Sequence, residues 1–149
     1  MKKKNNQSPT NLSYFGLSLL AYLKENHPLR ATDLWFITTR SDAAATVYSH
    51  SIKQELTHIE AEELANNELF RGLHFSAYNT LVNILWNEFS QDISEEDAHD
   101  VALNLLPLCK DVLAKYTLTD DFDETLQYDM LYTELVGTIQ ILLEDGTIQ

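Results

Sequence analysis

One stretch of the chain, residues 77–89, constrains the fold more than any other because it is apolar on almost every side of a helix. Its large apolar residues recur at helical spacings, and they are Tyr78, Leu81, Val82, Leu85, Trp86 and Phe89. Together they cover well over half of the circumference, and Ile84 lies almost opposite them. Such a helix needs other helices around it. The stretch therefore predicts a central apolar helix, near 77–90, in a multi-helical domain.

Signals for a helix end and a helix start precede this stretch. Gly72 follows a helical pattern and can adopt the left-handed conformation that ends helices. Ser76 offers a side-chain oxygen to the free N–H groups of the next helix. The sequence therefore predicts a helix, a tight apolar corner and a second helix between residues 69 and 89.

Three helices are expected before Gly72. The first extends from Ser13 to His27, because the following proline disfavours helical geometry in the residue before it. The second follows Thr32, a predicted N-cap, and runs for about 20 residues. The third starts at a capping box, Thr57-x-x-Glu60, and its predicted core residues are Ala61, Leu64, Ala65 and Leu69.

Two further helices are expected after the central one. Ser94 starts the fifth, whose apolar pattern continues past Pro107. Proline removes a helical hydrogen bond and clashes with the preceding turn, so we expect a kink or break near Leu105. The last helix is expected from Glu124 to Glu144, with Gly146 as its C-terminal stop.

The composition agrees with an all-helical fold. Only four Gly and three Pro occur in 149 residues, and Val and Ile are scarce beside Leu and Ala. We therefore predict an all-α protein, a single compact domain of about six helices at residues 13–146. Residues 1–12 are expected to form a disordered polar tail.

The negative charge is concentrated in the C-terminal part. Residues 91–149 contain 14 acids and two bases, whereas residues 1–90 contain nine acids and eight bases. This charge opposes direct binding to nucleic acid or to an anionic membrane and favours a basic protein partner. Simple solvation of the surface explains the same charge and stays open as the plainer alternative.

The sequence indicates a cytoplasmic protein. Cys109 is the only cysteine, so no intramolecular disulfide can form, and it lies on an apolar helix face. An apolar run at residues 14–23 follows Lys2–Lys4, but a polar spacer separates them and no small-residue cleavage site follows. We interpret this run as an amphipathic helix, and no run approaches the roughly 20 apolar residues of a membrane span.

Two Glu-x-x-His segments are the strongest hint of a metal site. Helical bundles that bind two irons use this motif, which occurs here at Glu55/His58 and Glu96/His99. Glu55 precedes the predicted cap of the helix that carries His58, and Glu96 points away from the core face of its own helix. A calcium-loop reading of residues 121–132 fails because Gly and Glu are missing at the sixth and twelfth positions. We expect no metal, no cofactor and no catalytic residues.

The remaining candidates for a functional surface surround the predicted corner and the central helix. They are Arg71, His74, Asn79, Asn83 and Asn87. The three asparagines form one row at i, i+4 and i+8 and could present a hydrogen-bonding surface. Local capping by His74 and ordinary wetting of the asparagine row stay open as alternatives.

Several segments carry a family resemblance. Leu69–Ser76 and Leu81–Phe89 resemble a family of small, acidic, all-helical bacterial proteins known as a domain of unknown function. The likeness extends to Ser13–Phe15, Ser41–Ala44, Leu105–Cys109 and Leu131–Leu135. It implies an origin in bacteria of the Bacteroides group, often in mobile or conjugative elements, and an accessory or interaction role.

The leading functional hypothesis is a non-enzymatic module for protein–protein interaction with an acidic C-terminal face. One alternative is a DNA mimic that inhibits a nucleic-acid-binding protein, and another is a metal-dependent enzyme that uses the Glu-x-x-His segments. Self-association into a homodimer is a further open possibility.

Overall fold

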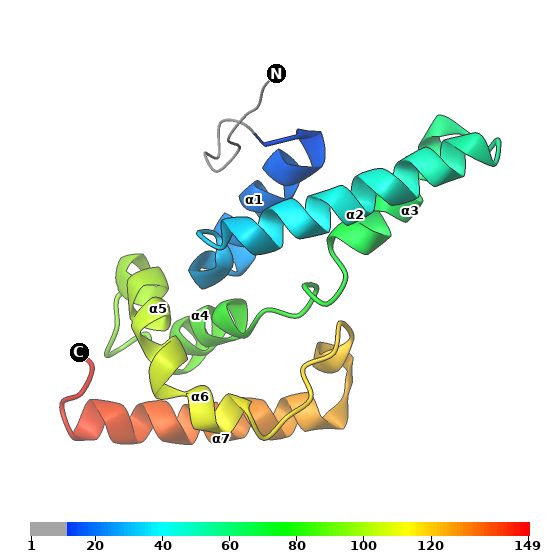
Figure 1. Cartoon of the computed structure of the whole chain (residues 1–149). Coiled ribbons are helices and arrows are strands. Elements are labelled where there is room, and N and C mark those ends of the chain that lie inside the picture. The colour runs from blue at the N-terminus through cyan, green and yellow to red at the C-terminus, as the bar shows by residue number, and fades with distance from the viewer. Residues whose placement is uncertain (1–11) are drawn as a thin grey trace. The chain divides into compact units, whose positions relative to one another are not determined.

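Helices account for all the regular secondary structure in the part of the chain that the structure describes. A computed structural model describes residues 12–149, which form seven α-helices and three short 3-10 turns without any strand (Figure 1). The predicted all-α fold is confirmed. The chain divides into two compact units, residues 1–71 and 72–149. The predicted domain at 13–146 stays a prediction, and almost all of the predicted tail, 1–12, lies outside the described residues.

The first unit begins with α1 (Tyr14–Asn26), whose start and end follow the predicted signals. The hydroxyl oxygen of Ser13 accepts a hydrogen bond from the Gly16 N–H at 3.1 Å. His27 leaves helical geometry immediately before the proline, as expected, and the 3-10 turn η2 (Pro28–Arg30) follows. Leu19 and Leu23 are fully buried on one face of α1.

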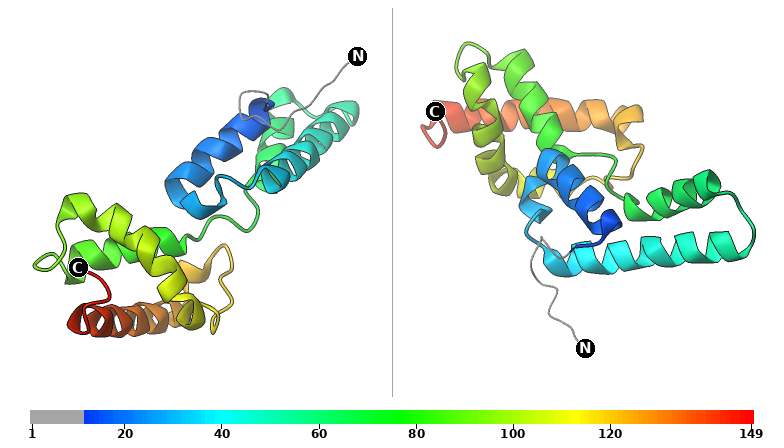
Figure 2. Two further views of the ribbon diagram at one scale, coloured as in Figure 1. Left: turned by 60° about the vertical axis from the view of Figure 1, so that its left-hand side comes forward. Right: turned by 90° about the horizontal axis from the view of Figure 1, so that it is seen from above.

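Two antiparallel helices, α2 (Leu34–Lys53) and α3 (His58–Leu69), pack side by side and complete this unit (Figure 2). Their close approach depends on small residues, because Ala44, Ala61 and Ala65 are fully buried. The predicted capping box at the start of α3 is present, with both reciprocal hydrogen bonds between Thr57 and Glu60.

Two predictions for this unit are wrong. The N-cap of α2 is Asp33, whose carboxylate accepts a hydrogen bond from the Phe36 N–H at 3.0 Å, and not Thr32. Carboxylates and hydroxyls both cap helices, so neighbouring candidates cannot be separated by residue type alone. Leu64 was expected in the core but is 43% exposed, because Ala61, Ala65 and Leu69 provide the buried face of α3.

The second unit is organised around α4 (Ala77–Glu88), as predicted. Leu81, Ile84 and Leu85 are almost completely buried although they point to different sides of this helix. The helices around it are α5 (Ala98–Leu108), α6 (Lys110–Leu113) and α7 (Leu126–Glu144), with the 3-10 turns η3 (Glu95–Asp97) and η4 (Phe122–Glu124). Trp86 departs from the prediction, because it is 40% exposed and lies beside the core rather than in it.

The helix that carries Pro107 breaks later than expected. Pro107 occupies the last turn of α5, and the break comes at Cys109, where φ is −98° and ψ is 10°, rather than near Leu105. The backbone N–H of Cys109 still donates to the Leu105 carbonyl, so the turn that contains the proline remains closed. The last helix starts two residues later than predicted and ends before Gly146, which adopts a φ of 80°. None of the described helices is both long and apolar enough to cross a membrane.

Candidate functional site

The corner between residues 72 and 76 is held by a carboxylate from a distant loop. Gly72 adopts a φ of 80°, as its predicted role requires. Asp120 accepts two hydrogen bonds of 3.0 Å, one from the N–H of Gly72 and one from the N–H of His74. A charged acceptor makes these hydrogen bonds stronger than neutral ones. The backbone of the corner is therefore fixed by a residue that is distant in the sequence.

Ser76 connects this corner to α4. Its hydroxyl oxygen accepts a hydrogen bond from the Asn79 N–H at 2.9 Å, which confirms the predicted cap. The buried hydroxyl of Thr80 donates to the Ser76 carbonyl at 3.1 Å. Both hydroxyls thus serve the start of the helix, and Asn79 and Asn83 follow one turn apart on its solvent side.

Aromatic packing brings the turn η4 next to this corner. The buried rings of Phe75 and Phe122 meet edge to face with their centroids 5.1 Å apart. Tyr128, on α7, packs edge to face against both rings, at 6.1 and 6.2 Å. This packing fixes η4, which carries Asp123, beside the beginning of α4.

A polar pocket of about 160 Å³ opens where these elements meet. It is lined by His74, Phe75, Ser76, Asn79, Thr80, Asn83, Asp123 and Tyr128. Three of the five candidates from the sequence, His74, Asn79 and Asn83, therefore lie in one pocket. Amide groups both donate and accept hydrogen bonds, and a carboxylate accepts them, so the pocket can bind a polar group that carries several donors.

The other two candidates lie outside this pocket. Arg71 belongs to the first unit and forms a 3.0 Å ion pair with Glu68, which lowers the pKa of that carboxyl. Asn87 is on α4, and its amide nitrogen lies 3.5 Å from the hydroxyl of Tyr132 on α7. Asn87 therefore lies outside the pocket that Asn79 and Asn83 line, and the asparagine row as a binding surface stays a prediction.

The two Glu-x-x-His segments do not form a metal centre in the described residues. Glu55 lies in the turn before α3 with a φ of 68°, and the ring nitrogen Nδ1 of His58 is hydrogen-bonded to the hydroxyl of Tyr48. His99 makes the same kind of contact with the hydroxyl of Tyr78, at 2.7 Å. Within residues 12–149, no group of three or more His, Cys, Asp or Glu side chains could hold a metal ion.

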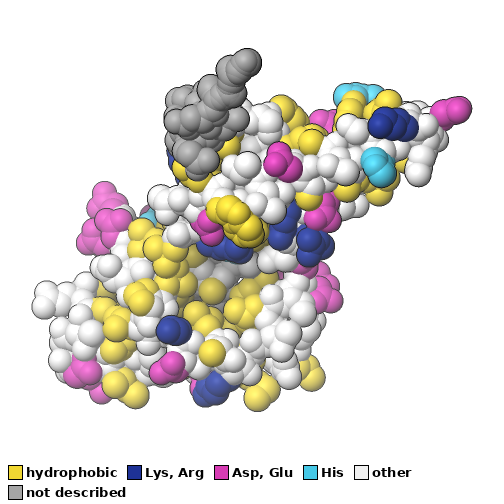
Figure 3. All heavy atoms as spheres, in the orientation of Figure 1, with side chains coloured by type: hydrophobic (Ala, Val, Ile, Leu, Met, Phe, Trp, Pro, Cys, Tyr) yellow, Lys and Arg dark blue, Asp and Glu magenta, His cyan; other side chains and the backbone are white. Residues whose placement is uncertain are grey.

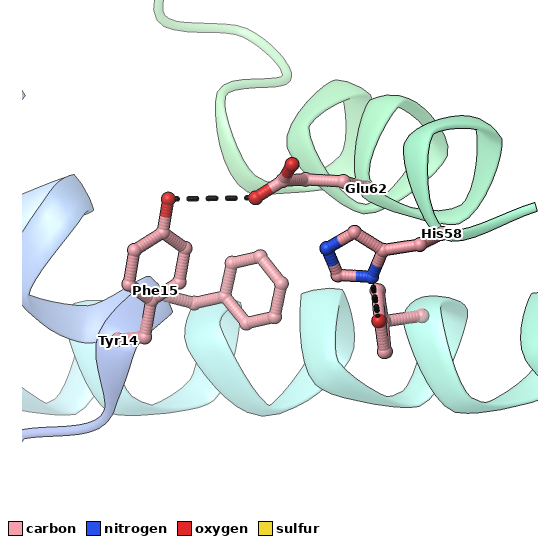
Figure 4. Close-up of a pocket in the computed structure, with 5 residues that line it drawn as sticks. Tyr14, Phe15, His58 and Glu62 are labelled. Carbon is pink, nitrogen blue, oxygen red and sulfur yellow. Dashed lines mark hydrogen bonds between the residues drawn. The ribbon is translucent and has the colours of Figure 1, made fainter.

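A second pocket, on the first unit, was missed by the sequence analysis (Figure 4). Its volume is about 410 Å³, and it is lined by Tyr14, Phe15, Tyr48, His58 and Glu62. These residues come from α1, α2 and α3, so the pocket depends on how three helices pack. Nothing in the local spacing of the sequence brings these five side chains together.

The net charge of the chain lies entirely in the second unit. Residues 72–149 contain 15 acids and two bases, for a net charge of −13, whereas residues 1–71 contain eight acids and eight bases. In the second unit, Lys115 forms an ion pair with Glu134. Lys115, together with the Tyr116 hydroxyl, lowers the pKa of Glu134. On the face shown in Figure 3, the acidic side chains of this unit are dispersed.

Comparison with known proteins places the chain in a family. The model of DUF1896, a domain of unknown function, matches residues 7–148. The chain belongs to this family. The crystal structure of protein PG0816 from Porphyromonas gingivalis is similar to this DUF1896 chain, with a TM-score of 0.88 and 43% sequence identity. The alignment covers 91% of this chain and 93% of that chain. No curated protein matches.

These findings confirm the resemblance that the sequence suggested. The DUF1896 match covers almost the whole chain, and Porphyromonas belongs to the same bacterial group that the resemblance implied. The descriptions of the family and of PG0816 name no activity. The two pockets and the distribution of charge are therefore the features of the chain that bear on its function.

Proposed function

We propose that the chain is a non-enzymatic interaction module that binds a basic protein through its second unit. The observation that carries this proposal is the net charge of −13 on residues 72–149, where 15 acids face two bases. Long-range attraction would draw a basic partner to this unit and would accelerate binding at low ionic strength.

The polar pocket at the start of α4 offers a place to fix one side chain of that partner. Its volume of about 160 Å³ suits the end of a single side chain. The carboxylate of Asp123 and the amide oxygens of Asn79 and Asn83 are acceptors, which match the fork of donors on an arginine guanidinium. We expect the partner to insert an arginine here.

The engagement of the pocket hydroxyls supports binding rather than catalysis. The Ser76 oxygen accepts from the start of α4, and the Thr80 hydroxyl donates to a backbone carbonyl. The Thr80 hydroxyl is thus engaged with a carbonyl and not with a base that would activate it as a nucleophile. Cys109 is buried, and burial raises its pKa to about 11, which disfavours the reactive thiolate.

The test is affinity purification of the tagged full chain from its native cell at low and high salt, with two matched variants. Asp123→Asn and Asp129→Asn each remove one negative charge from the second unit, but only Asp123 lines the pocket. We expect Asp123→Asn to weaken binding of the recovered partner about tenfold, because a charge-assisted hydrogen bond is lost. Asp129→Asn should stay close to wild type.

A peptide from the recovered partner then tests the arginine directly. Replacement of its arginine by citrulline keeps the shape and removes the charge, so the citrulline peptide should bind about tenfold more weakly. Failure to recover any partner at low salt would overturn the proposed function. Equal weakening by Asp123→Asn and Asp129→Asn would overturn the assignment of the pocket.

The same charge also favours the DNA-mimic alternative. A mimic needs carboxylates arranged like the phosphates of a duplex, and on the face shown in Figure 3 they are scattered. A competition experiment with duplex DNA distinguishes the two functions. A duplex oligonucleotide should displace the chain from its partner if the chain is a mimic, and it should have no effect on a partner that does not bind DNA.

A further inference from the structure

Three aromatic rings form the walls of the pocket on the first unit (Figure 4). The rings of Tyr14 and Phe15 meet at 69° with their centroids 5.4 Å apart, and those of Phe15 and Tyr48 are inclined at 57° and 6.4 Å apart. Rings inclined in this way present faces and edges to a common space instead of stacking on one another. Because the face of an aromatic ring is electronegative, such a space attracts a cation.

A carboxylate completes the pocket. Glu62 is half-buried, and the hydroxyl of Tyr14 donates to its Oε2 atom at 3.4 Å, which holds the carboxylate at the edge of the aromatic walls. No Lys or Arg forms an ion pair with Glu62 among the described residues. On the far wall, the hydroxyl of Tyr48 is hydrogen-bonded to the imidazole of His58, which fixes both rings.

We propose that this pocket binds a methylated ammonium group carried on an alkyl chain, as in choline or trimethyllysine. The three rings would contact the methyl groups and the spread charge of the cation, while Glu62 would supply the opposite charge. An unmethylated ammonium is more strongly hydrated and needs up to three acceptors, whereas the one carboxylate here suits a cation without N–H donors. This inference concerns the first unit and does not rest on the proposed function of the second.

The first experiment compares choline with 3,3-dimethylbutan-1-ol by NMR titration of the full-length protein. The two molecules have the same shape, but only choline is charged. We expect saturable binding of choline with a dissociation constant on the order of 1 mM, and shifts confined to the amides and rings around Tyr14, Tyr48 and Glu62. The neutral alcohol should bind at least about fivefold more weakly. Equal binding of the two molecules would overturn the proposal.

Two pairs of variants test the walls of the pocket. Glu62→Gln should weaken choline binding about fivefold, whereas Glu63→Gln, its neighbour on α3 outside the pocket, should not. Tyr14→Leu should cause a loss of about fivefold, whereas Trp35→Leu should not. Both aromatic residues are largely exposed, at 68% and 77%, so neither substitution removes core packing. Equal losses within either pair would contradict the assigned walls.

The source of the cation is tested with two further probes. N-acetyl-trimethyllysine amide is compared with N-acetyl-lysine amide, and tighter binding of the methylated form by about fivefold is expected. If it also binds more tightly than choline, the ligand is a modified protein side chain; the reverse order indicates a small molecule. Each titration is repeated on a variant with Lys2, Lys3 and Lys4 replaced by Ala, so that these three lysines cannot compete. Absence of binding in both backgrounds would overturn the inference.

Discussion

Burial of the Cys109 thiol in the core of the second unit makes the stability of the protein depend on pH. The side chain is fully buried between α5 and α6, and burial raises its pKa from 9.0 to about 11. The unfolded chain releases this proton near the ordinary pKa, whereas the native state retains it. The contribution of this group to the free energy of unfolding is therefore fully present below pH 9. It is lost as the pH rises from 9 through 11, and the loss amounts to about 2–3 kcal/mol. Urea unfolding at several pH values between 8 and 11 measures this loss.

Cys109→Ala is the matched control for that experiment. Alanine leaves a buried apolar group at the same position but removes the titrating thiol, so the variant should lose less stability than wild type over this pH range. Tyr78 and Tyr132, whose pKa values are also raised by burial, are common to both proteins and cancel in the comparison. Identical pH profiles for the two proteins would show that the thiol does not contribute.

The range of an interaction along the chain decides which residue roles could be predicted. The Thr57–Glu60 box and the Ser76 cap act over three residues, and both were identified from the sequence. Asp120 holds the same corner as Gly72, but it lies 48 residues away, and no local pattern connects the two. Asp123 reaches the polar pocket for a similar reason, through the packing of Phe122 on Phe75.

At the level of single helices, the start of α2 offers a test of capping. Asp33 accepts the Phe36 N–H and its negative charge lies at the positive end of the helix, whereas the neighbouring Thr32 has no capping bond. Asp33→Ala should therefore lower the free energy of unfolding by about 1 kcal/mol, and Thr32→Ala should change it by a few tenths at most. Chemical denaturation of both variants measures the difference. A larger loss for Thr32→Ala would mean that the helix starts one residue earlier in solution.

The faces that helices bury were harder to predict than the helices themselves. Six of the seven α-helices follow apolar patterns that were visible in the sequence, and α6 is the piece that the break at Cys109 separates from α5. Leu64 and Trp86 fit those patterns yet remain 43% and 40% exposed, because neighbouring helices cover only part of each apolar stripe. The aromatic pocket was still harder to predict from the sequence, since it depends on the register of three helices.

On the scale of the whole molecule, the acidic C-terminal part and the second unit cover nearly the same residues. The sequence placed the acidic part at residues 91–149, and the unit begins at Gly72. Residues 72–90 add a single acid, Glu88, so the earlier boundary hardly alters the charge. The charge could be counted from the sequence, but the coincidence with a compact unit depends on tertiary contacts that no composition reveals.

Because the net negative charge is confined to the second unit, we predict that salt changes the stability of the two units differently. The second unit repels itself with a net charge of −13, whereas residues 1–71 are balanced, so screening should stabilise the second unit more. Between 10 and 500 mM sodium chloride, amide hydrogen exchange in α4 and α7 should slow about fivefold, equivalent to about 1 kcal/mol, and exchange in α2 and α3 should change little. Chloride is chosen because sulfate strengthens apolar burial in any protein. Equal slowing in both units would mean that salt acts on the general stability of the chain rather than on the charge of residues 72–149.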